Sequence, residues 1–173
     1  MKAVTLRHPW PWAICVCGKD VENRTWEPAL KQGEWFAIHG GKWPLPIPAE
    51  GSSVPAPRSA AVAEYVEEII DTVKELSGEG LCPGPVVTLR ELSRYTGIVA
   101  VAQFGGCVHA HASPWFGGPV GWLLSGVASL PDPIPCRGAQ GLWSLPADVE
   151  SQMRQQMMQI FPWASSFRPC PSR

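Results

Sequence analysis

The stretch HPWPWAICVCGKDVENRTW, residues 8–26, decides the fold that we predict for this chain, because the other segments are organised around it. Pro9 stands where a helix can begin, since the first turn of a helix does not use the N–H group that proline lacks. Gly18 is typical of a residue at which a helix ends. We therefore predict a short buried helix followed by a strand over residues 19–26.

Charged side chains gather on one face of that strand. Successive side chains of a strand point to opposite faces, so Glu22 and Arg24 share one face and Val21 lies on the other. Arg24 could hold a phosphate or a carboxylate through paired hydrogen bonds. Lys19 could act as a base or nucleophile if burial lowers its pKa. The structural alternative is an ion pair that closes the turn between helix and strand.

These residues resemble the signature of the ASCH domain, a relative of the PUA fold. The matching positions at the beginning of the chain are Pro9, Trp10, Lys19, Glu22 and Arg24. The segments that are similar to the second half of the family are GIVAVAQF (97–104), SPWFGGPVGWLL (113–124) and PIPCRGAQGLW (133–143). The chain departs from the family two positions before the lysine, where Cys17 replaces a glycine and Gly18 follows.

The resemblance implies an α+β fold, a PUA-like mixed β-barrel of about five or six strands flanked by helices. Residues 1–145 would form the ASCH domain, with a Pro-rich and helical insert at about 44–94. Residues 146–173 would form a C-terminal helix and a loose tail. The family's cleft would accept RNA, single-stranded nucleic acid or a nucleotide, and would read an unstacked base, modified or not. No cofactor or metal is implied.

The same resemblance assigns roles to six residues. Arg24 and Lys19 would neutralise phosphate, and Glu22 would accept a hydrogen bond from a base. Trp10 and Trp115 lie beside prolines in loops, so we expect them to be exposed and to stack on bases. Ser113 would add a hydroxyl group to the same wall. Trp12, Trp122 and Trp143 are predicted to be core residues.

An enzymatic function is the alternative within the same family. Its small members include an amidohydrolase that acts on 4-N-acetylcytidine, and proteins proposed as ribonucleases. In such an enzyme Lys19 would be the nucleophile or base and Glu22 would relay protons. The amidohydrolase subgroup has a threonine where this chain has Glu22, so the deacylation mechanism of that subgroup cannot be assigned unchanged to this chain. Whether the protein is an enzyme stays open.

Composition limits the partners. The 173 residues are enough for one domain, and a net charge of −1 provides no general attraction for a nucleic-acid duplex, so any contact must be local. The six cysteines show no framework spacing, and there is neither a leader nor an apolar run long enough for a membrane span. We expect reduced thiols and a cytoplasmic protein without membrane contact.

Two other patterns could carry function. Cys107, His109 and His111 would share one face of a strand, but they lack the two paired clusters of a strong zinc signature, so we predict no metal. A helix over residues 59–76 has an apolar stripe and an acidic outer face that would repel phosphate. We predict that it packs on the core, with docking of a protein partner as the alternative.

The remaining pattern predicts further elements. Expected strands cover residues 1–7, 33–39, 97–104, 120–124 and 142–143, a turn covers 131–133, and helices cover 88–95 and 146–161. His39, near the end of the second of these strands, is predicted to be a surface histidine, with a position facing the cleft as the alternative.

Overall fold

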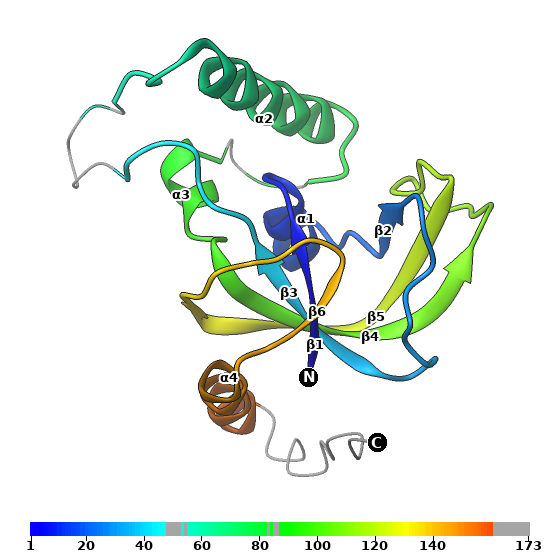
Figure 1. Cartoon of the computed structure of the whole chain (residues 1–173). Helices are drawn as coiled ribbons and strands as arrows, with labels where there is room; N and C mark the ends of the chain where they lie inside the picture. The colour runs from blue at the N-terminus through cyan, green and yellow to red at the C-terminus, as the bar shows by residue number, and fades with distance from the viewer. Residues whose placement is uncertain (48–52, 54, 83, 85–86, 161–173) are drawn as a thin grey trace.

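Six strands form one curled sheet in the part of the chain that the computed structural model describes, residues 1–47, 53, 55–82, 84 and 87–160. The strands are β1 (Lys2–Leu6), β2 (Val21–Arg24), β3 (Trp35–Gly40), β4 (Gly97–Val108), β5 (Val120–Ile134) and β6 (Leu142–Ser144). Their order is β2-β5-β4-β3-β1-β6, in which only β1 and β3 pair in parallel. The sheet curls into a half-barrel (Figure 1), which confirms the predicted α+β class and mixed, barrel-like sheet.

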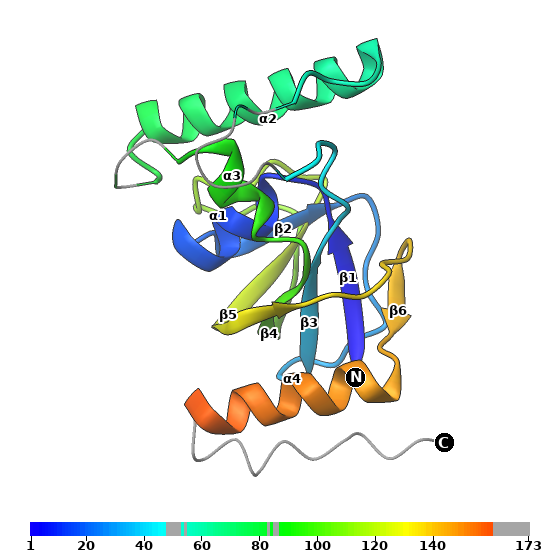
Figure 2. The same ribbon diagram turned by 90° about the vertical axis from the view of Figure 1, so that its left-hand side faces the viewer.

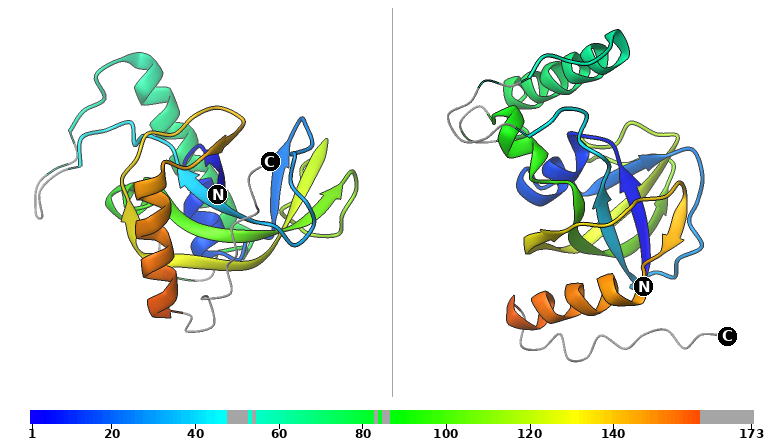
Figure 3. Two further views of the ribbon diagram at one scale, coloured as in Figure 1. Left: turned by 60° about the horizontal axis from the view of Figure 1, so that its bottom comes forward. Right: turned by 60° about the vertical axis from the view of Figure 1, so that its left-hand side comes forward.

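Four helices accompany the sheet among the described residues: α1 (Trp10–Val16), α2 (Ala60–Gly78), α3 (Leu89–Ser93) and α4 (Ala147–Ile160). The Ser59 hydroxyl accepts a hydrogen bond from the Val62 N–H at the start of α2, and Thr88 and Glu91 form a capping box that starts α3. Figures 2 and 3 show α2 beyond one end of the sheet and α4 across the other. Within the described residues, no helix combines the length and apolar character that crossing a membrane requires.

Trp122 on β5 is the centre of the main core. Its ring is fully buried and meets the rings of Trp26 and Phe36 edge-on, at centroid distances of 4.8 and 6.3 Å. Its Nε1–H donates to the Trp26 carbonyl at 2.9 Å, so the buried indole keeps its hydrogen bond. Trp122 and Trp12 are core residues, as predicted, whereas Trp143 is only half-buried.

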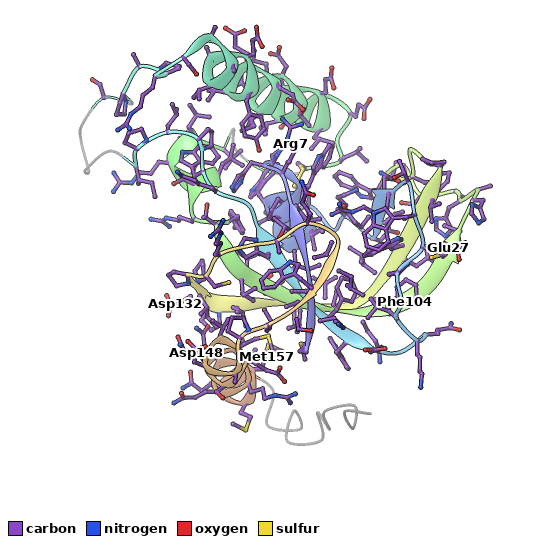
Figure 4. The ribbon with its side chains drawn as sticks, in the orientation of Figure 1. Arg7, Glu27, Phe104, Asp132, Asp148 and Met157 are labelled. Carbon is purple, nitrogen blue, oxygen red and sulfur yellow. A yellow bond between two sulfur atoms is a disulfide. The ribbon has the colours of Figure 1, made fainter. Side chains whose placement is uncertain are left out.

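The apolar stripe of α2 packs as the sequence predicts. Its buried side chains are Val66, Ile69, Val73 and Leu76, in one cluster with Trp12, Trp43 and Trp115. Tyr65 on the same helix accepts a hydrogen bond from the His8 N–H at 3.0 Å. Arg7 at the end of β1 (Figure 4) lies 4.4 Å from the centre of the Tyr65 ring and pairs with Glu68. Docking of a protein partner on the acidic face stays a prediction.

A disulfide between Cys17 and Cys82 ties the end of α1 to the segment that follows α2. The two Cα atoms lie 4.7 Å apart, although 65 positions separate the residues in the chain. The expectation of reduced thiols is therefore wrong for these two cysteines. Spacing alone does not reveal the pair, because only the packing of α2 on α1 brings Cys82 back to Cys17.

Three local predictions are corrected. Residues 131–133, predicted to turn, continue β5, where a register shift between Ile98 and Ala100 of β4 accommodates the prolines. The helical spacing of Val149, Met153 and Met157 predicts that Ile160 also faces inward, but Ile160 is 38% exposed in the last turn of α4. β4 and β5 are both longer than predicted. The tail from 161 and parts of the Pro-rich connector lie outside the described residues.

Replacing Cys82 with serine tests the disulfide. Because the bond joins residues 65 positions apart, we expect Cys82→Ser to lower the free energy of unfolding by about 2–4 kcal/mol in non-reducing urea denaturation. Cys107→Ser changes a free, half-buried cysteine and is the matched control. Alkylation of the unfolded, unreduced wild type should leave two cysteines unmodified; modification of all six would contradict the disulfide.

Candidate functional site

Arg24 joins two distant strands across the open side of the half-barrel. Its Nε lies 3.0 Å from Oε1 of Glu22, and its Nη2 donates to the Thr5 carbonyl on β1 at 3.0 Å. The guanidinium also lies over the Trp122 ring, 5.8 Å from its centre. Because β2 and β1 stand first and fifth in the sheet order, Arg24 links two strands that do not pair with each other.

Glu22 is the buried partner of this arginine. Its side chain is 7% exposed, and the alternation of β2 puts it on the face of Arg24, as predicted. Burial raises the pKa of Glu22, while the positive charges of Arg24 and Lys19 oppose that rise. A buried carboxylate that loses its cation strongly destabilises a protein. The geometry of this pair therefore fits the structural alternative stated above.

Lys19 lies between two tryptophans. Its Nζ donates to the Val21 carbonyl at 2.5 Å and lies 5.0 and 5.5 Å from the ring centres of Trp10 and Trp115. Burial lowers the pKa of Lys19, and the nearby carboxylates of Glu22 and Asp20 oppose that change. Trp115, predicted to be exposed, is only 8% exposed, because its loop folds the ring onto Lys19 and α2. Cation–π contacts thus occupy both indoles.

The loop that carries Trp115 is fastened to the β2 segment. Asn23 donates from Nδ2 to the Trp115 carbonyl at 2.8 Å and accepts from the Gly117 N–H at 3.0 Å. The Ser113 hydroxyl in the same loop donates to Oδ1 of Asp20 at 2.5 Å. These bonds hold the box of Trp10, Lys19 and Trp115 together.

A cavity of about 880 Å³ lies next to Arg24. Its walls come from the end of β2, the ends of β1 and β3, and the segment that precedes β6. The lining residues used below are Arg24, Trp26, His39, Lys42, Arg137 and Gly138. The cavity occupies the open side of the half-barrel, and its volume is in the range of about 300–1,000 Å³ typical of small-ligand sites.

Positive charge dominates this cavity. Arg24, Lys42 and Arg137 line it, and among the residues that the structure describes, no Asp or Glu belongs to the lining. Glu22 balances the charge of Arg24. Lys42 and Arg137 are exposed, and neither side chain forms an ion pair or hydrogen bond with any residue that the structure describes. The cavity therefore presents about two uncompensated positive charges to a ligand.

His39 forms part of the cavity wall and is 3% exposed. Its Nε2 lies 3.1 Å from the Cys136 carbonyl and donates to it, because a carbonyl can only accept. Gly138 packs directly on the ring: a Cβ at 138 would lie 2.5 Å from Cε1 of His39 and 2.7 Å from Oγ1 of Thr5. The expectation of a surface histidine is therefore wrong, since the segment with Gly138 covers the ring.

Sequence reasoning predicted Arg24 of the cavity wall and left His39 as an alternative. Of the six predicted site residues, Arg24 lines the cavity. The other five lie beside it, in α1 (Trp10), on β2 (Glu22), in the turn between them (Lys19) and in the loop before β5 (Ser113 and Trp115). The residues that it missed are Lys42 and Arg137, whereas Trp26 belongs to the tryptophans whose segments are predicted to converge. A signal exists for both, because Lys42 lies just after β3 and Arg137 lies between β5 and β6, next to strand ends that meet at the opening.

The Cys107, His109 and His111 segment shows other contacts. His109 lies 3.3 Å from Glu27, and Nδ1 of His111 accepts from the Ser113 N–H at 3.1 Å. In the described part of the chain, no group of three or more His, Cys, Asp or Glu side chains could hold a metal ion.

Comparison with known proteins adds no assignment: no protein-family model matches the chain, and a search of curated proteins finds no match. The function must therefore be argued from the cavity and its residues.

Two buried histidines should make stability depend on pH. Burial lowers the pKa of His8 and His39 below the value of about 6.5 of an exposed histidine, so the unfolded chain binds protons that the folded protein does not. The stability that the two neutral rings contribute is fully present above that pH, and it is lost as the pH falls through their lowered pKa values. His39→Gln, whose amide can replace the donor to Cys136, should weaken this loss.

Urea denaturation at about pH 7.5 and about pH 5.5 measures this difference on either side of the ordinary histidine pKa. His111→Asn alters an exposed ring and should retain the difference between the two pH values seen for the wild type. An identical pH dependence for His39→Gln and the wild type would contradict the role of His39.

Proposed function

We propose that the protein is a PUA-like ASCH domain that binds a nucleotide, or an unpaired nucleotide of single-stranded RNA, in the cavity beside Arg24. The supporting observation is a cavity that combines positive charge with the indole of Trp26 and whose described lining residues include no Asp or Glu. Indoles stack on bases with little sequence preference, and arginine and lysine neutralise phosphate. The curled mixed sheet with its helices is compatible with the PUA-like fold.

The packed residues act through Arg24 in this proposal. Arg24 faces the ligand, and Glu22 positions it by the ion pair of 3.0 Å. Lys19 supports the negative charge of Glu22 from its tryptophan box. Stacking falls to Trp26, because the Lys19 ammonium lies over the rings of Trp10 and Trp115. Reading one unstacked base agrees with the low net charge, which does not favour a duplex.

Substituting Trp26 tests the stacking role. Stacking on an aromatic side chain contributes about 1–3 kcal/mol per base, so Trp26→Leu should weaken nucleotide binding about 5- to 150-fold. Trp26→Phe keeps an aromatic face and should restore part of the affinity. Isothermal titration calorimetry with nucleoside monophosphates measures both. Equal affinity of the wild type and a folded Trp26→Leu variant would exclude stacking at this position.

Hydrolysis is the second candidate function, and the lowered pKa of Lys19 favours it. A buried lysine with a lowered pKa is a better base or nucleophile, and Glu22 lies close enough to influence it. Lys19 nevertheless is only 3% exposed and does not line the cavity. Its ammonium donates to the Val21 carbonyl. We therefore rank an amidohydrolase acting on N4-acylated cytidines, or a ribonuclease, below binding.

A turnover assay separates the two functions. We expect the wild-type protein to release no acetate from 4-N-acetylcytidine and to leave an oligoribonucleotide intact, both followed by mass spectrometry, because Lys19 is closed off from the cavity. The control is Lys19→Met, which keeps an unbranched chain between the two indoles. Turnover by the wild type that is absent in folded Lys19→Met would reverse the ranking.

A further inference from the structure

We propose that the cavity takes one nucleotide bearing a terminal phosphate, and not an extended strand of RNA. The inference deepens the proposed function, on which it rests, and concerns the chemical class of the ligand. It depends on how many free cations the cavity contains and on what surrounds the cavity.

The count of free cations matches a phosphomonoester. Arg24 is compensated by Glu22, whereas Lys42 and Arg137 have no partner among the described residues, which leaves about two positive charges. A terminal phosphate carries a charge of about −1.5 to −2 at pH 7, while the phosphodiester of an internal nucleotide carries only −1. A terminal phosphate therefore neutralises both cations, and one internal linkage neutralises only one of them.

The surroundings of the cavity do not favour a longer strand. The cavity lies where β1 and β3 end, and α2 lies beyond that end of the sheet (Figure 2). The exposed acidic side chains of α2 are Glu64, Glu67, Glu68, Asp71 and Glu75. Two of them are paired, Glu68 with Arg7 and Asp71 with Lys74. A strand that leaves the cavity in this direction meets carboxylates that repel its phosphates.

Two sources could supply this chemistry, a free mononucleotide or the phosphorylated end of an RNA. The cavity volume of about 880 Å³ admits a ligand of nucleotide size from either source. A series of adenosine ligands separates them: the nucleoside, its 5′- and 3′-monophosphates, the dinucleoside monophosphate, and a decanucleotide with and without a 5′-phosphate.

Calorimetric titration of this series gives the test. The better monophosphate should bind at least about tenfold more tightly than the nucleoside, because its phosphate gains charge-assisted hydrogen bonds. The phosphorylated decanucleotide, which has one terminal phosphate, should bind no more tightly than the monophosphate. With two cations engaged, the slope of log affinity against log salt for the decanucleotide should be about −1.4.

The outcomes separate the two proposals. Affinity that rises with every added nucleotide, or a salt slope steeper than about −3, overturns the terminal-phosphate inference and leaves nucleotide binding intact. No binding of any ligand by the folded protein overturns both. A phosphorylated decanucleotide that binds no better than the unphosphorylated one assigns the cavity to free mononucleotides, and the inference stands.

Variants identify the cations. The double substitution of Lys42→Gln and Arg137→Gln should reduce binding of the monophosphate to that of the nucleoside and leave nucleoside affinity unchanged. Lys74→Gln removes an exposed lysine on α2 and is the matched control for loss of one surface charge. Equal loss of nucleoside and nucleotide affinity in the double variant would contradict a phosphate-specific role.

Discussion

The contact of Arg24 with Thr5 is the constraint on which the site depends. The curled sheet does not close by strand pairing, because β2 and β6 are its two edges. Arg24 bridges the opening instead, with one hydrogen bond to β1 and an ion pair to Glu22 within β2. Since the same guanidinium lines the cavity, one residue both bridges the opening and faces the site. Removing Glu22 would leave a partly buried cation, and removing Arg24 a buried carboxylate.

The opposite wall depends on the close approach of Gly138 to its neighbours. β6 pairs with β1, which returns the segment before it to the ends of β1 and β3. Gly138 in this segment approaches His39 and Thr5 so closely that a Cβ would overlap both. Trp143 closes the same corner, since its Nε1–H donates to the Thr5 hydroxyl at 3.1 Å. The neutral form of His39 suits this packing, because a protonated ring would place a charge in a covered position.

Sequence patterns predicted the features that depend on residues close together in the chain. Alternation placed Glu22 beside Arg24, a capping box located α3, and the apolar stripe of α2 identified its buried face. The rest depends on which distant segments meet. The disulfide of Cys17 requires α2 to fold back on α1, and Trp115 is buried because Asn23 fastens its loop to β2. Lys42 and Arg137 look like ordinary surface residues until the ends of β3 and the β6 segment are brought to one opening.

The division of labour among the cations follows from burial. Lys19 is surrounded by indoles and carboxylates, so its charge is compensated within the fold and its ammonium has a fixed hydrogen-bond partner. Lys42 and Arg137 are exposed to water, where an unpaired cation carries no desolvation penalty and stays available to bind an anionic ligand. The sequence signature of Lys19, Glu22 and Arg24 therefore acts as the support of a site, with only Arg24 reaching the surface that a ligand would touch. In the proposed site, Lys19 and Glu22 of this pattern would hold the architecture, and recognition would fall to Arg24 together with residues outside the pattern.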